Sequence, residues 1–206
     1  MYLLCVYGII ILQTNTKDFA AENAADNEVF EMARKAREKS SLGIYNIMLR
    51  GDDLFKTEAD YDAFIERMTQ YFMGDASIYA YCLTDNAACF ILKESENGVS
   101  SDMKPFVTSY ARYCNRTRGT KGSVFTDRFK SEPINDKNYL LQSMTVMHKL
   151  YLLLNRDAYT GDDDILNGDG LCDSKTALKL IGSKKKYISA MESDDTALTP
   201  FYNVLK

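Results

Sequence analysis

The chain has 206 residues, of which 46% are hydrophobic and 26% are charged. This length fits one domain of ordinary size with a small appendage, and the composition excludes a disordered chain. The net charge is −4 and the isoelectric point is about 5.1, so the overall charge argues against nucleic-acid binding, and any such function must depend on local clusters.

The five cysteines are far apart, and no two of them form a Cys-x-x-Cys pair. This pattern indicates neither a disulfide framework nor a zinc knuckle, and it favours a reducing, cytoplasmic location. The cysteines are Cys5, Cys82, Cys89, Cys114 and Cys172.

Residues 1–31 are expected to be a leader outside the fold. The apolar segment 1–12 is shorter than the ~20 residues of a membrane-spanning helix. No basic residue precedes it, which argues against a signal peptide, although the alanine-rich segment 20–25 resembles a cleavage region. The leader could also be an artefact of start-site choice, with Met32 as the true start.

The folded part is expected to begin with a basic arm over residues 32–41. Residues 43–50 are expected to form a β-strand, in which Ile44, Asn46 and Met48 face one side and Tyr45, Ile47 and Leu49 face the other. Residues 57–72 carry apolar side chains at spacings of three and four, which predicts an amphipathic helix, with Thr57 as its N-cap and Asp60 completing a partial capping box.

The next two apolar runs, 78–83 and 88–93, are rich in β-formers and are separated by Thr, Asp and Asn. This arrangement predicts a hairpin. A second helix is expected over 101–116 and a further strand over 125–134, and Pro133 indicates that this strand lies at the edge of the sheet.

A third helix is expected over 135–154, which completes a domain of residues 32–155. The order of elements predicts an α+β fold, an antiparallel sheet with helices on one face. The acidic, glycine-rich segment 156–172 reads as a linker, and no EF-hand pattern fits it. The tail, 173–206, contains two short helix candidates, which form either a helix-turn-helix or a terminal helical clip.

Several blocks along this chain resemble the single-tyrosine HUH transposases, the REP-associated and insertion-sequence-type enzymes. The resemblance extends over about residues 32–195 and implies a ferredoxin-like or RRM-like sheet with a small helical C-terminal extension. The block at 122–134, followed by 139–141, resembles the segment that precedes the catalytic helix of that family, both in residue types and in spacing. The other similar blocks are 32–41, 43–51, 79–83, 109–116, 171–173 and 178–182.

The resemblance also implies where catalytic groups would lie, because these enzymes cleave DNA with a tyrosine nucleophile and a divalent metal held by two histidines. The histidine positions correspond to Ala87 and Cys89, the tyrosine position to Val146 and a third ligand position to Leu150. Alanine, valine and leucine supply no ligand or nucleophile, and a thiolate suits magnesium or manganese poorly. We therefore expect no catalytic residues, no cofactor and a lost magnesium or manganese site.

His148 is the only histidine in the chain, so no shift of the alignment restores a two-histidine site. It is expected to be a partly exposed helix residue rather than a ligand. Tyr139 and Tyr151 lie on the same predicted helix, where core packing explains them better than a role as nucleophile.

Two basic clusters remain as candidates for DNA binding, one on the N-terminal arm and one between Arg112 and Lys130. Composition alone indicates that these clusters are solvated charged segments. The family resemblance favours a role in DNA binding. The candidate DNA-binding residues are Arg34, Lys35, Arg37, Lys39, Arg50, Arg112, Arg116, Arg118, Lys121, Arg128 and Lys130.

Three hypotheses follow. The first is a catalytically inactive, transposase-like protein that recognises single-stranded or hairpin DNA, with a homodimer possible and no membrane partner. The second is an active transposase with displaced catalytic residues. The third is a protein-interaction or regulatory module that binds no nucleic acid.

Overall fold

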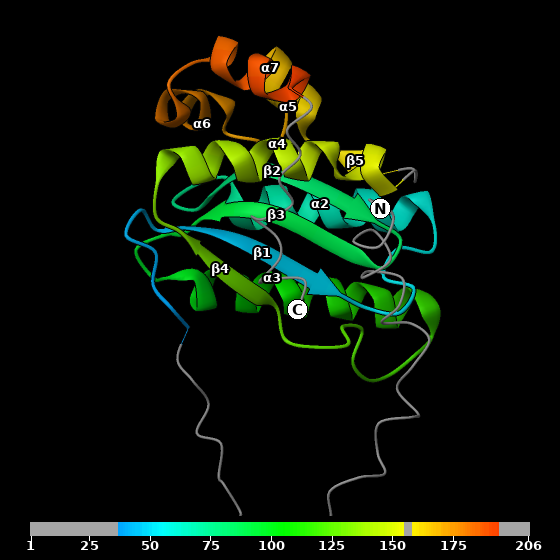
Figure 1. Ribbon diagram of the computed structural model, residues 1–206. Coiled ribbons are helices and arrows are strands. Elements are labelled where there is room, and N and C mark those ends of the chain that lie inside the picture. The colour runs from blue at the N-terminus through cyan, green and yellow to red at the C-terminus, as the bar shows by residue number, and fades with distance from the viewer. Residues whose placement is uncertain (1–36, 155–157, 194–206) are drawn as a thin grey trace, which may run out of the picture. The chain divides into compact units, whose positions relative to one another are not determined.

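The computed structural model describes residues 37–154 and 158–193, and those from Glu38 onward form one compact unit. Their strands make a five-stranded sheet in the order β4-β1-β3-β2-β5, with every neighbouring pair antiparallel (Figure 1). The strands are β1 (Ile44–Arg50), β2 (Ser77–Thr84), β3 (Ala87–Lys93), β4 (Lys130–Ile134) and β5 (Tyr159–Thr160). The predicted α+β class and antiparallel sheet are confirmed.

The helices lie close to their predicted positions. Thr57 caps the first one, and its capping box with Asp60 is formed on both sides. The third begins after Asp136, whose carboxylate accepts from the backbone N–H groups of Asn138 and Tyr139, both at 2.9 Å. The helices are α2 (Glu58–Phe72), α3 (Val99–Arg118), α4 (Lys137–Leu154), α5 (Asp162–Asn167), α6 (Ser174–Ile181) and α7 (Lys184–Glu192).

The predicted hairpin and edge strand are both present. β2 and β3 pair across the two-residue turn of Asp85 and Asn86. β4 pairs only with β1 among the described strands, and it contains Pro133, which has no N–H to donate to a further strand.

Helices cover both faces of the sheet, where one face was expected. Asn46 of β1 donates to Ser143 of α4 at 3.2 Å, so α4 covers the face to which Asn46 points. Phe90 of β3 points to the opposite face and contacts the rings of Phe72 in α2 and Phe106 in α3. The sheet therefore lies between α4 on one side and α2 with α3 on the other (Figure 1). The sequences of β1, β2 and β3 explain why both faces are covered. Their buried residues follow one another instead of alternating with exposed ones.

The segment predicted as an acidic linker is folded onto the sheet. β5 pairs with β2, and the Asp164 carboxylate accepts from the N–H groups of Leu171 at 2.9 Å and Cys172 at 3.1 Å. Gly170 has a φ of +119° and lies so close to Asp164 that a β-carbon there would clash with the carboxylate. The prediction of a linker is therefore wrong for the described residues of this segment, because Asp164 of the acidic run makes structural hydrogen bonds that composition alone does not reveal.

The two predicted C-terminal helices are present as α6 and α7, and both contact α4. Tyr187 of α7 is fully buried and points to His148 of α4. This packing agrees with a helical clip. In the part of the chain that the structure describes, no helix combines the length and apolar character needed to cross a bilayer.

Candidate nucleic-acid interface

The positions to which the sequence resemblance assigns the catalytic groups are Ala87, Cys89, Val146 and Leu150, and their residue types include no tyrosine or histidine. Ala87 begins β3, and Cys89 lies two residues on, facing the same side of the sheet as Asn46 because Met48, its partner in the register, does so. Cys89 and Val146 are buried. Burial raises the pKa of the Cys89 thiol, so this cysteine stays protonated.

A magnesium or manganese ion does not fit this place. Alanine cannot ligate, and a buried, protonated thiol is a poor partner for a hard cation. The described residues include no group of three or more histidine, cysteine, aspartate or glutamate side chains arranged to hold a metal ion. The side chain of Leu150 lies outside the described part.

His148 and Tyr139 were also considered for catalysis, and the packing and hydrogen bonds around them favour structural roles. His148 is fully buried, so the expectation of a partly exposed residue is wrong. Tyr187 of α7 and Asp162 of α5 lie beside its ring, and the helix pattern alone could not predict these contacts. Tyr139 donates to Glu132 at 2.5 Å, and its burial together with this hydrogen bond raises the pKa of the phenol, which makes it a poor nucleophile.

A basic groove lies between α2 and α3, on the helical layer that covers the Phe90 face. Its volume is about 460 Å³. Four cations and two tyrosines line it together with small polar residues and one proline. The lining residues are Arg67, Tyr71, Lys104, Pro105, Thr108, Ser109, Arg112, Tyr113 and Arg116.

The groove has features of a phosphate-binding surface. Arg112 and Arg116 are exposed, and they lie one helical turn apart. The Arg67 guanidinium lies 4.7 Å from the centre of the Tyr113 ring, so this aromatic face already holds a cation. The acid that contacts Arg67 is Glu66, at 3.8 Å, and it is itself largely exposed.

Sequence reasoning named Arg112 and Arg116 but missed Arg67, Lys104 and the tyrosines. A signal existed for part of this set, because Lys104, Thr108, Arg112 and Arg116 recur every four residues along α3. Arg67 comes from another helix, so only the packing of α2 on α3 brings it into the groove.

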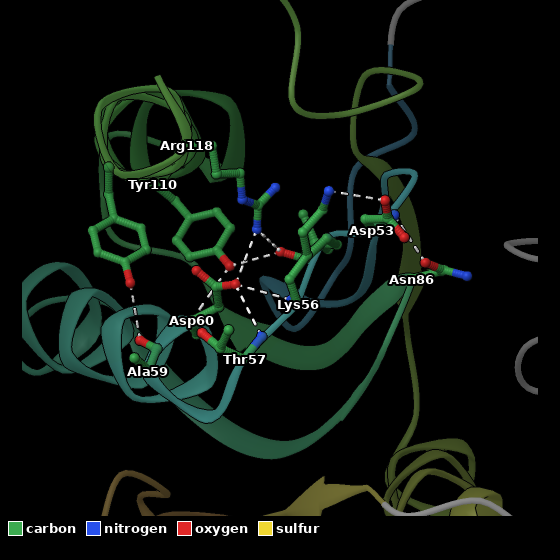
Figure 2. Close-up of polar contacts among 10 residues, drawn as sticks. Asp53, Lys56, Thr57, Ala59, Asp60, Asn86, Tyr110 and Arg118 are labelled. Carbon is green, nitrogen blue, oxygen red and sulfur yellow. Dashed lines mark hydrogen bonds and ion pairs between the residues drawn. The ribbon is translucent and has the colours of Figure 1, made fainter. Parts of the chain in front are cut away.

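Arg118 is not part of this surface. It forms an ion pair with Asp60 at 3.1 Å, and it also donates to the Leu54 carbonyl at 3.0 Å (Figure 2). Its side chain is 17% exposed and that of Asp60 is 4% exposed. Burial opposes ionisation of Asp60, but backbone N–H donors and Arg118 outweigh it, so the pKa of Asp60 is lowered. Arg118 joins α3 to the start of α2.

A second group of cations lies at the end of β1. Arg50 forms an ion pair with Asp127 at 3.6 Å. Lys130 begins β4 and is half-buried, and both its burial and the charge of Arg50 lower its pKa. Arg128, which lies between Asp127 and Lys130 in the sequence, is exposed.

The remaining predicted residues are dispersed. Lys39 and Lys121 are exposed, and Arg37 is the first described residue. Arg34 and Lys35 lie outside the described residues. The predicted cations therefore do not form one group, since Arg112 and Arg116 line the α2–α3 groove, Arg118 is paired with Asp60, and Lys130 lies on β4.

Comparison with known proteins supports the fold. No family model and no curated protein matches the sequence. A solved structure does match, that of a REP-associated tyrosine transposase bound to a REP hairpin, with a TM-score of 0.52 and 11% sequence identity. The match covers 66% of this chain and 86% of the transposase. At this identity the similarity establishes a shared α+β fold.

Proposed function

We propose that this protein binds structured single-stranded DNA, such as a hairpin, and does not cleave it by the tyrosine and metal route. The α2–α3 groove carries the proposal, because four cations and two aromatic rings gather there on an otherwise acidic protein. Cations bind phosphates, and the Tyr71 ring can stack on a base, which together suit a single strand. The Tyr113 ring lies between Arg67 and the Tyr110 ring, so it holds a groove cation in place. The solved structure with the similar fold is bound to a hairpin, which favours DNA over a protein partner.

The absence of cleavage rests on the residue types at Ala87, Cys89 and Val146. The four described cysteines are free and buried, in keeping with the reducing cytoplasm that we propose as the location.

DNA binding is tested by titrating a labelled hairpin oligonucleotide with a single-stranded tail across a salt series. Binding should weaken steeply with salt, and Arg112→Gln with Arg116→Gln should lower the slope of log affinity against log salt by about two. Lys175→Gln with Lys179→Gln is the matched control, since these lysines are also exposed and four residues apart, but lie on α6. The control should leave the slope unchanged. Binding that is absent, or indifferent to salt, would favour the interaction-module hypothesis.

Cleavage is tested with the same hairpin in magnesium or manganese. We expect no covalent protein–DNA adduct on a denaturing gel. An adduct would identify an active transposase with a displaced nucleophile.

A further inference from the structure

At the end of β1, two cations lie beside Ala87 and Cys89, the positions to which the resemblance assigns metal ligands. Arg50 is paired with Ala87 across β1 and β3. Met48 is paired with Cys89 on one side and with Lys130 on the other. Directly paired residues of antiparallel strands project from the same face, so these side chains all start from the face covered by α4.

The two cations are only partly neutralised. Asp127 contacts Arg50 at 3.6 Å, and its side chain is 61% exposed, so this ion pair is weak. Arg50 also acts on Lys130, since its charge lowers the pKa of the lysine. Asp127 raises the pKa of Lys130 in turn, but this single exposed acid offsets only part of two adjacent positive charges, which indicates that the place is suited to bind a further anion.

We propose that Arg50 and Lys130 form a phosphodiester-binding site that substitutes for the divalent metal. A guanidinium can donate two hydrogen bonds to phosphate oxygens, and an ammonium adds a second charge. This proposal rests on the proposed DNA binding, and it makes that binding independent of magnesium and manganese. The site lies on the α4 face, opposite the α2–α3 groove, so the two contact different parts of a bound DNA.

The site holds a phosphate without activating it. No bond is formed or broken, since the neighbouring Ala87 and Cys89 supply neither a ligand nor an ionised nucleophile. Tyr139 is tied to Glu132.

The test measures binding of the tailed hairpin by the full chain in EDTA and in magnesium or manganese, at matched ionic strength. The wild-type affinity should be equal in all three. Arg50→Gln with Lys130→Gln should weaken binding about tenfold or more, as expected for charge-assisted hydrogen bonds. Arg50→Lys with Lys130→Arg keeps both charges and should retain most of the affinity, while thermal unfolding checks that each variant is folded.

The Asp127→Asn variant separates the two roles of Arg50 most clearly. Removing the acid should tighten DNA binding if Arg50 contacts phosphate. A purely structural role for Arg50 predicts no such gain. Binding abolished by EDTA, an unweakened double Gln variant, or an Asp127→Asn variant that does not bind more tightly overturns the site. If the wild type binds no hairpin at all, the proposed function itself has failed.

Discussion

Arg116 and Arg118 lie two residues apart on α3, yet they have different surroundings. Arg116 is exposed in the groove, whereas Arg118 is held between Asp60 and the Leu54 carbonyl (Figure 2). A basic segment read from sequence alone cannot separate the two, because the partner of Arg118 lies 58 residues away.

Replacing each arginine by methionine separates a structural cation from a binding one. Arg118→Met leaves the buried Asp60 carboxylate without its counter-charge, so it should lower the free energy of unfolding by about 3 kcal/mol. Arg116→Met should change it by at most about 0.5 kcal/mol, as is typical of an exposed position. Chemical denaturation measures both. Equal effects would mean that the Asp60–Arg118 pair contributes no stability.

At the scale of elements, α7 is attached to α4 through a buried chain of hydrogen bonds. Tyr187 donates to Asp162 at 2.6 Å, and its oxygen lies 2.6 Å from Nδ1 of His148. Since the tyrosine proton goes to the carboxylate, Nδ1 of His148 carries the proton that bonds to Tyr187. Nε2 is then a buried acceptor without a partner among the described residues. Burial opposes protonation more than Asp162 favours it, and the pKa of His148 falls to about 4.

This depressed pKa predicts loss of stability in mild acid. The unfolded chain takes up a proton near pH 6.5, the ordinary value, while the folded chain does so only near pH 4. The stability is therefore full above about 6.5 and falls as the pH drops towards 4, by roughly 3 kcal/mol. Denaturation of the wild type and of His148→Leu across this range measures it. Because the chain has one histidine, the variant should lose this part of the pH dependence; identical profiles would contradict the assignment.

The sequence predicted the elements whose signals are local. The capping box at Thr57, the turn at Asp85 and Asn86, and the edge position marked by Pro133 depend on neighbouring residues. The helices on both faces, the folded acidic segment and the buried His148 depend on contacts between distant segments. In the candidate site, the four-residue spacing of cations on α3 could be read from the sequence, but the contribution of Arg67 required the packing of α2.

Residues 158–193, the described part of the C-terminal segment, belong to the same compact unit as the sheet. The Gly161 N–H donates to the Tyr81 carbonyl at 3.1 Å, and that of Asp173 donates to Ile78 at 2.8 Å. Both bonds attach the segment to β2.

Hydrogen exchange should therefore find the amides of Gly161 and Asp173 protected to nearly the same extent as those of β2. The exposed segment 121–123 is the internal reference and should exchange quickly. Fast exchange at Gly161 and Asp173 would restore the interpretation of this segment as a linker.

The two outer strands also limit how copies of this protein could meet. β4 has five residues, including Pro133, and β5 has two. Neither offers a long row of free N–H and C=O groups on which another chain could extend the ladder. Within the described residues, both margins of the sheet are therefore poor places for a second copy to add a strand, which disfavours fibre-like growth.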